Sequence, residues 1–224
     1  MFKVFNLKKN AFHNRIKTNR VSLNGGFTMT TKELIYENAL DLFSKHGYNN
    51  VGMRDLAKSV GIKAASIYNH YKGKEEILLD IAKTLVEELQ KEVYPLYKES
   101  HLSTRQYFTN ISLKTNLFFE SDKINQLTRL LIPEQFNSPR LKHILHDEFL
   151  VKPRVALNYY FNNLMQKGLM KSTDSMLAAK IYHSFFVYHF YEKYLTDSPE
   201  GFLTSYEDLF KKHIDFFMNY FDVK

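Results

Sequence analysis

The sequence predicts an all-α protein of about nine helices, and three observations support this fold class. Apolar residues recur at spacings of three and four along most of the chain, which is the pattern of helices that bury one face. No segment alternates apolar and polar residues between turn signals, as a half-buried strand would. The 224 residues include 19 Phe and 15 Tyr, enough large side chains for the core of one large domain or two small ones.

The first expected helix shows the pattern clearly. Leu34, Ile35 and Ala39 fall on one helical stripe. Thr31 is a residue type that caps helix N-termini, and Gly47 is the type that ends helices. We therefore expect a helix between these two positions.

Prolines and a second capping pattern divide the rest of the chain. Pro95 cannot continue a helical hydrogen-bond ladder, so a long helix must end before it. Pro153 either kinks the helix in which it lies or begins a new one. Thr204 and Glu207 have the spacing of a capping box before the last helix. The expected helices are 31–46, 53–59, 64–70, 74–94, 103–120, 122–132, 139–167, 174–196 and 205–221.

Composition excludes several kinds of chemistry and location. The chain has no Cys, which rules out disulfides, thiolate zinc sites, iron–sulfur clusters and Cys nucleophiles, and is compatible with a reducing cytoplasm. Its longest stretch without a charged residue, 155–166, is too short to cross a bilayer. The N-terminus lacks the apolar run of a secretory signal. We expect a cytoplasmic protein that makes no membrane contact.

Patterns of catalysis and metal binding are missing as well. The sequence contains no Gly-rich phosphate loop, metal-peptidase helix motif or nucleophile elbow. His143, His146 and Asp147 are spaced like metal ligands, but no fourth ligand is identifiable, and surface histidines explain them better. We expect no enzyme activity, no cofactor and no metal.

The segment 54–68 has the pattern of a helix-turn-helix. Two short helical stretches meet at Gly61, and their apolar residues are spaced to form a small shared core. The second stretch presents a slim polar face, which suits the major groove of DNA. Residues 46–74 carry five basic residues against Asp55 alone. A helical hairpin inside an ordinary bundle is the alternative interpretation. The face consists of Lys63, Ala64, Ser66 and Asn69, and the expected core of Leu56, Ala57, Val60, Ile62 and Ile67.

A longer run in register resembles the TetR family of bacterial transcription regulators. It covers about residues 30 to 78 and combines a helical stripe, a Gly-aromatic turn, the helix-turn-helix and a Tyr-x-His-aromatic-x-x-Lys-Glu tail. The resemblance implies a three-helix DNA-binding domain at 29–75 and a helical ligand-binding and dimerisation domain at 76–224. The matching segments are Thr31-Lys32-Glu33-Leu34-Ile35, His46-Gly47-Tyr48, Met53-Arg54-Asp55-Leu56-Ala57, Val60-Gly61-Ile62 and Ser66 to Leu78.

The resemblance also implies roles in DNA binding. Tyr68, His70 and Lys74 match positions that grip phosphates, and Arg54 matches one that reaches a base or a phosphate. The matching base-facing residues are Lys63, Ala64 and Ser66. Tyr68 as a packed aromatic and His70 as a surface histidine are the alternatives.

Two departures from the family pattern affect the expected contacts. Many relatives have Ser or Thr where this chain has Gly52, so a side-chain phosphate donor is missing there. Ala64 and Ala65 give the recognition helix few hydrogen-bonding groups. We therefore expect an operator that contains A·T pairs read by apolar contact or by shape.

The C-terminal part carries the expected dimer interface and ligand pocket. The last helix is apolar over more than one face, which predicts a second buried surface against a partner, although a helix wrapped inside its own domain is the alternative. The expected dimer residues are Phe210, Ile214, Phe217 and Phe221. The candidate ligand-binding residues, each of which could instead be plain core, are Tyr107, Phe118, Tyr160, Phe161, Met165, Tyr182, Phe186 and Tyr188.

The basic N-terminal segment has three possible interpretations. The formal net charge is +7, yet six basic residues and no acidic residue lie in 1–28, so the remainder is nearly neutral. We expect 1–28 to be a flexible extension: an arm that touches DNA, an organelle-targeting segment, or sequence upstream of a true start at Met29. The last is preferred because codons for Gly25 and Gly26 would resemble a ribosome-binding site.

The sequence therefore predicts a DNA-binding regulator with three partners: double-stranded operator DNA, a second copy of itself and a small-molecule inducer. The expected mechanism is repression by a homodimer on a palindromic operator, relieved when the inducer binds the C-terminal domain. The alternative is an all-α adaptor that keeps this fold without ligand-controlled operator binding.

Overall fold

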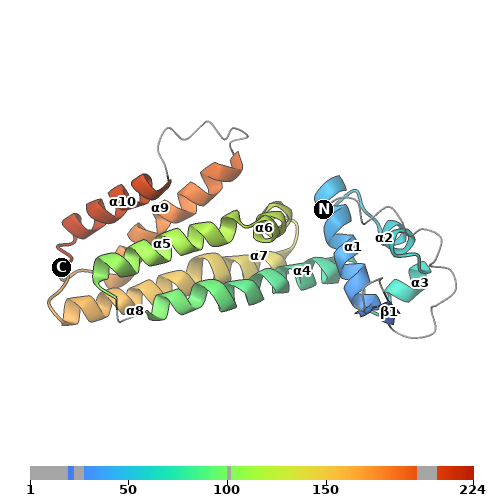
Figure 1. Cartoon of the computed structure of the whole chain (residues 1–224), viewed down its shortest axis with the longest axis horizontal. Helices are drawn as coiled ribbons and strands as arrows, with labels where there is room; N and C mark the ends of the chain where they lie inside the picture. Colours follow the sequence, from blue (N-terminus) through green and yellow to red (C-terminus); the bar gives the residue numbers. More distant parts are fainter. Residues whose placement is uncertain (1–19, 23–27, 100–101, 196–205) are drawn as a thin grey trace. The chain divides into compact units, whose positions relative to one another are not determined.

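The computed structural model describes residues 20–22, 28–99, 102–195 and 206–224, and these are helical almost throughout (Figure 1). The all-α prediction is confirmed. One short element was not expected: strand β1 (Arg20–Ser22) pairs antiparallel with β2 (Thr28–Thr30). Three-residue strands are too short to show an alternating pattern, so they could not be predicted from the sequence. They lie at the end of the segment expected to be flexible.

The chain divides into two compact units, Met1–Ile81 and Ala82–Lys224. The first unit contains the strand pair and three helices, α1 (Thr31–His46), α2 (Met53–Val60) and α3 (Ala64–Ile67). The division falls inside α4 (Lys74–Glu88), so this one helix contributes residues to both units.

The second unit consists of helices interrupted by irregular turns. After α4 the chain forms a π-helical turn η2 and a 3₁₀ turn η3, and a second π-helical turn, η4, joins α7 to α8. Helix α8 packs along α9, and α10 packs against α5. The elements are η2 (Leu89–Val93), η3 (Tyr94–Lys98), α5 (Thr104–Glu120), α6 (Asp122–Glu134), α7 (Pro139–His146), η4 (Asp147–Val151), α8 (Lys152–Gln166), α9 (Ser175–Leu195) and α10 (Tyr206–Tyr220).

Helix ends agree with most of the expected signals, with two corrections. The N-cap of α1 is Thr30 rather than Thr31: its hydroxyl accepts the Glu33 N–H at 3.2 Å, and the Glu33 carboxylate accepts the Thr30 N–H at 2.7 Å. The expected helix 64–70 ends at Ile67, because the N–H groups of His70 and Tyr71 both point to the Ile67 carbonyl and close the last turn.

The prolines have the predicted consequences. Pro95 lies in the 3₁₀ turn that follows α4 and η2, and Pro153 lies in the first turn of α8. The long stretch 139–167 is therefore two helices with η4 between them. The expected capping box involves Thr204, which lies outside the described residues.

Aromatic side chains form the core of the second unit. Phe108, Phe161, Tyr182 and Phe217 are nearly inaccessible to solvent, and the Phe217 ring lies 5.0 to 5.8 Å from the other three ring centroids. These rings come from α5, α8, α9 and α10. One cluster therefore joins four helices that are distant in sequence.

Candidate DNA-binding interface and ligand cavity

The turn between α2 and α3 is fixed by backbone geometry. Gly61 has φ +75°, a left-handed conformation that glycine adopts without strain, and its N–H donates to the Ala57 and Lys58 carbonyls. The Ile62 N–H also donates to the Ala57 carbonyl, at 3.0 Å. These bonds end α2 and redirect the chain into α3.

The start of α2 is capped from inside the helix. Gly52 has no side chain to accept a helix N–H, but the Asp55 carboxylate accepts the Gly52 N–H at 2.9 Å. A carboxylate in the first turn also interacts favourably with the helix dipole. The unusual Gly52 therefore leaves the helix end in place, although it offers no side chain to a ligand.

A small apolar core holds α2 and α3 together. Leu56, Ala57, Val60 and Ile67 are buried, as the sequence predicts, whereas Ile62 is only partly buried. Because Ala57 is small, α3 can approach α2 closely. The result is a rigid two-helix unit that turns its other side outward.

The expected DNA-contacting residues lie on that outer side. Arg54, Lys63 and Asn69 are exposed, and Tyr68 exposes 54% of its surface. Tyr68 is therefore not packed between helices. Lys63 is the N-cap of α3. Because this helix is only four residues long, Tyr68 is its C-cap, and Asn69 and His70 lie in the turn that follows. The remaining expected contacts, Ala64, Ser66, His70 and Lys74, are partly exposed.

Lys74 makes contacts within its own chain. Its Nζ donates to the Tyr48 carbonyl at 2.7 Å and lies 4.2 Å from the centroid of the Tyr48 ring. The Tyr48 ring in turn packs edge-on against Phe43 of α1, with centroids 5.1 Å apart. Lys74 therefore fixes the start of α4 to the end of α1, a role that the sequence analysis did not foresee.

A second link between α1 and α4 was also missed. The hydroxyl of buried Tyr71 donates to the Asp80 carboxylate at 2.7 Å, and Lys32 Nζ lies 3.0 Å from the same carboxylate. Burial raises the pKa of the Tyr71 phenol, and the hydrogen bond to Asp80 raises it further. The sequence carries no clear signal for this link, because Tyr68 and Tyr71 are the same residue type and the pattern does not tell which ring points inward.

The second unit contains a partly open cavity of about 330 Å³. Side chains from α5, α7, η4 and α9 line it, with one each from η3, α6, α8 and α10 and Gln135 just after α6, and most are apolar. Phe119, Phe149 and Phe190 pack against one another in its wall, with centroids 5.0 to 6.0 Å apart. A volume near the lower end of known small-molecule sites, about 300–1,000 Å³, and an apolar lining are typical of ligand cavities.

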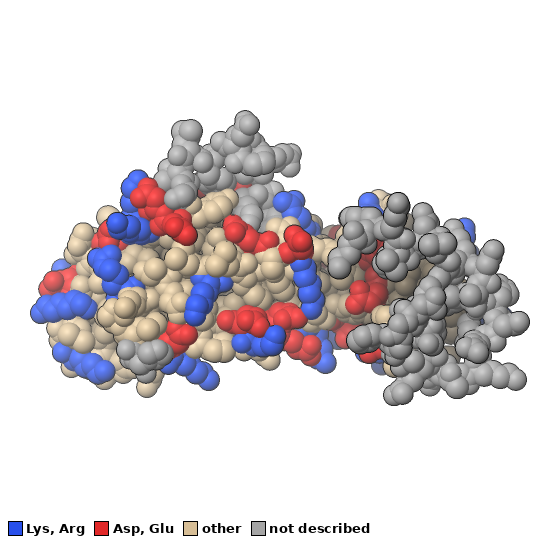
Figure 2. Space-filling view, viewed as in Figure 1, with Lys and Arg blue, Asp and Glu red and all other residues tan. Residues whose placement is uncertain are grey.

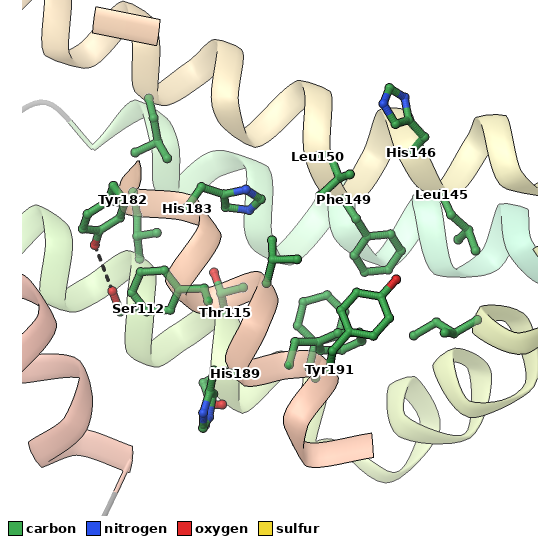
Figure 3. Close-up of a pocket in the computed structure, with 18 of the residues that line it drawn as sticks. Ser112, Thr115, Leu145, His146, Phe149, Leu150, Tyr182, His183, His189 and Tyr191 are labelled. Atoms are coloured by element: carbon green, nitrogen blue, oxygen red, sulfur yellow. Dashed lines mark hydrogen bonds between the residues drawn. The ribbon is translucent and has the colours of Figure 1, made fainter. Parts of the chain in front are cut away.

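Four polar side chains line this cavity at the Tyr182 end. Ser112 and Tyr182 are hydrogen-bonded at 3.0 Å, so their hydroxyls are satisfied (Figure 3). Thr115 Oγ1 and His183 Nδ1 are buried and have no hydrogen-bond partner among the described residues. Burial lowers the pKa of His183 to about 4, and the nearby Arg154 charge contributes. His183 is therefore a neutral imidazole at physiological pH.

The structure brings two of the eight candidate ligand-binding residues to this cavity, Tyr182 and Phe186. The others lie elsewhere because each helix turns only one face to the cavity. Phe118 lines a separate depression, and Tyr188 is 66% exposed. Four belong to the neighbouring core cluster: Tyr107, Tyr160, Phe161 and Met165. Thr115, Phe149 and His183 were missed, because the sequence does not tell which face of each helix turns inward.

The four expected dimer residues are buried within their own chain. Phe210, Ile214, Phe217 and Phe221 expose 1 to 5% of their surface, because they form the inner face of α10. The exposed apolar side chains of the last two helices are different ones: Phe216 and Tyr220 on α10, and Leu177, Ile181, Tyr188 and Tyr191 on α9.

The remaining surface gives no sign of a metal or membrane site within the described residues. Asp147 lies 3.5 Å from His143 and 3.3 Å from His146, but no group of three His, Asp or Glu side chains there is arranged to hold a metal ion. No described helix is long and apolar enough to span a bilayer. Basic and acidic side chains are intermixed over the visible face of the second unit (Figure 2).

Two protein-family models match the chain, one in each unit. The family described as "Bacterial regulatory proteins, tetR family" matches residues 35–81, and the "AefR-like transcriptional repressor, C-terminal domain" matches residues 107–219. The chain belongs to the TetR family. This TetR-type regulator thus carries its helix-turn-helix and its cavity in the two parts that these descriptions cover.

Individual relatives are similar over different lengths. The biofilm operon icaADBC negative transcriptional regulator IcaR of Staphylococcus epidermidis is 52% identical over 46 residues, which are 20% of this chain and 25% of that protein. IcaR of Staphylococcus aureus strain Newman is 48% identical over 46 residues, with the same shares. The match thus spans a quarter of the length of these relatives.

Solved structures match over most of the chain. SmeT, the repressor of the Stenotrophomonas maltophilia multidrug efflux pump SmeDEF, has a TM-score of 0.64 at 17% identity, covering 88% of this chain and 92% of SmeT. A TetR family regulator from Pseudomonas syringae pv. tomato has a TM-score of 0.64 at 16% identity, covering 85% and 96%. These similarities show that the TetR-type fold extends through both units.

Proposed function

We propose that this TetR-type regulator is a repressor that binds a palindromic operator as a homodimer and leaves it when a small molecule fills the cavity. The observation that carries the proposal is the pairing of an exposed, basic helix-turn-helix with a largely apolar, partly open cavity in one chain. A regulator of this kind acts where the chromosome is, so we expect it in the cytoplasm.

The outer face of the helix-turn-helix supports DNA binding. Arg54 and Lys63 are exposed cations at the N-terminal ends of α2 and α3, where they can reach phosphates or base edges. Tyr68 and His70 offer a hydroxyl and an imidazole for phosphate contacts. Ala64 has only a methyl group to offer, which suits a thymine methyl and keeps the expectation of A·T pairs in the operator.

Exposed apolar side chains on the last two helices support dimerisation. Phe216 and Tyr220 stack on each other, with centroids 6.1 Å apart, and each exposes about two thirds of its surface. Side chains of this size are unfavourable in water. We therefore place the dimer interface on these residues and on Leu177, Ile181 and Tyr188, instead of on the buried Phe210, Ile214, Phe217 and Phe221.

A chain of contacts supports release by a ligand. Lys74 holds the start of α4 to the first unit, and the segment that continues α4 ends at η3. There the Tyr94 hydroxyl donates to the Glu148 carboxylate in η4, and Lys152 also contacts that carboxylate. The next residue, Phe149, lines the cavity. A ligand that displaces η4 would thus pull on the segment attached to α4.

Selection of genomic fragments by the purified protein tests the proposal. We expect enrichment of a palindromic site, with an affinity that falls steeply as salt concentration rises. A protein that enriches no sequence and is indifferent to salt would be an adaptor instead of a repressor.

A further inference from the structure

The cavity has two chemically distinct ends. Figure 3 shows Thr115 and His183 on the side where Ser112 and Tyr182 lie, and Phe149 and Tyr191 toward the opposite end. At the first end, Thr115 Oγ1 and His183 Nδ1 are buried without partners among the described residues. At the second, the aromatic wall of Phe119, Phe149 and Phe190 offers ring edges and faces.

The two polar atoms without hydrogen-bond partners indicate which ligand group would suit the polar end of the cavity. A buried polar group without a hydrogen bond costs about 1–3 kcal/mol, so such groups are normally satisfied. A threonine hydroxyl can donate and accept, and a neutral imidazole has one donor and one acceptor nitrogen. A single hydroxyl or carbonyl oxygen placed between them would satisfy both.

The charges around the cavity argue against an ionic ligand. Among the described residues that line it, none is Asp or Glu, so an ammonium group would have no counter-ion. The charged lining residue Lys142 and the titratable His146 are both exposed, and so lie on the solvent side of the wall. A carboxylate at the polar end would exchange its hydration for hydrogen bonds to neutral groups such as Thr115 and His183, because Arg154, whose charge acts on His183, does not line the cavity; this exchange is unfavourable.

We propose that the cavity binds an uncharged molecule of one or two aromatic rings that carries a single hydroxyl or carbonyl group. The oxygen hydrogen-bonds to Thr115 and His183, and the rings pack edge-to-face against Phe119, Phe149 and Phe190. This inference rests on the proposed function, because it names the class of ligand for the same cavity.

A matched set of naphthalenes tests the ligand class on the full-length protein. The probes are 2-naphthol, naphthalene, 2-naphthoate and 2-naphthylmethylammonium, which share one ring system and differ in the polar group. The protein has no Trp, so naphthol fluorescence can be followed without indole emission. We expect 2-naphthol to bind at least fivefold more tightly than naphthalene, and both charged probes to bind more weakly than 2-naphthol.

Two variants test the assigned oxygen partners. Thr115→Val and His183→Phe should each weaken 2-naphthol binding about three- to tenfold, the range for one net hydrogen bond. Naphthalene binding should change less than twofold, which shows that the cavity is intact. The matched control is Thr109→Val on the exposed face of α5, which should leave both affinities unchanged.

Three results would overturn the ligand class: 2-naphthoate or the ammonium probe binding more tightly than 2-naphthol, equal loss of naphthol and naphthalene binding in both variants, or no binding by any probe. The operator assay separates this from the proposed function. Naphthol binding without a change in operator affinity would contradict ligand release alone, and intact operator binding without naphthol binding would contradict the ligand class alone.

Discussion

The two units of the chain differ in how far apart in sequence their defining contacts lie. In the first unit, Asp55 accepts the N–H of the N-cap residue three positions earlier, and Lys74 reaches a carbonyl 26 residues away. In the second, the hydrogen bond between Ser112 and Tyr182 spans 70 residues, and the cavity is lined by residues from Tyr97 to Phe210. The helix-turn-helix of the first unit is therefore built from local signals, whereas the core and cavity of the second unit depend on packing between helices that are distant in sequence.

The largest expected effect comes from replacing Phe217 on α10, with Phe216 as its matched control. The two variants test the role of packing in the second unit. Phe217→Ala should lower the free energy of unfolding by about 3–5 kcal/mol, because a buried ring leaves a cavity among Phe108, Phe161 and Tyr182. Urea unfolding measures this.

The neighbouring residue, Phe216, is the control for Phe217→Ala. Phe216 is 65% exposed, so Phe216→Ala should change protomer stability little. It should instead shift the monomer–dimer equilibrium toward monomer in sedimentation experiments. A Phe216→Ala protein that unfolds as easily as Phe217→Ala would contradict the assignment of inner and outer faces.

The second-largest expected effect is a decrease in the free energy of unfolding at acidic pH, and it originates in the second unit. His183 resists protonation in the folded state down to a pKa of about 4, whereas in the unfolded chain it protonates near 6.5. The unfolded state therefore binds more protons between these values, and stability falls as the pH drops through this window. The expected contribution is about 2 kcal/mol between pH 8 and pH 5.

Urea unfolding at both pH values, with His183→Phe for comparison, checks this contribution. The variant should lose less stability between pH 8 and pH 5 than the parent protein. A residual slope is expected from His213, whose pKa burial also lowers to about 4. Equal slopes for parent and variant would show that His183 is solvated in the folded state.

The same contrast explains which features could be predicted from sequence. The helix-turn-helix was predictable because Gly61 and the apolar residues around it lie within one short window. The cavity was not, because whether Tyr182 or Tyr188 faces inward depends on the rotation of α9 against α5 and α10. Apolar content alone also does not tell which side of α10 is buried in its own chain: Phe216 and Phe217 are adjacent and equally apolar, yet only Phe217 is buried.

A third prediction separates the residues of the first unit that recognise bases from those that contact phosphates. Lys63→Ala should change which bases are preferred in the operator, with about a tenfold loss on the parent site. Tyr68→Ala should weaken binding to all sequences alike. Binding to a randomised duplex library distinguishes the two, and a uniform loss for Lys63→Ala would contradict its place on the base-reading face.

The smallest expected effect probes the Tyr71–Asp80 hydrogen bond of the first unit. Tyr71→Phe removes the hydroxyl that donates to Asp80 but keeps the buried ring, so the free energy of unfolding should fall by about 1 kcal/mol. Asp80 keeps its contact with Lys32, which limits the loss. Because Asp80 also contacts Lys32 of α1, a weaker hold on this carboxylate should lower operator affinity together with stability.

Comparison with Tyr68→Phe makes that small effect interpretable. Tyr68 is 54% exposed, so loss of its hydroxyl should leave unfolding unchanged and lower operator affinity only through a lost phosphate contact. If Tyr71→Phe reduced operator affinity without any change in unfolding, its hydroxyl would be acting on DNA directly. The Tyr71 hydroxyl would then take part in DNA recognition instead of supporting α4, and the proposed difference in role between Tyr68 and Tyr71 would be wrong.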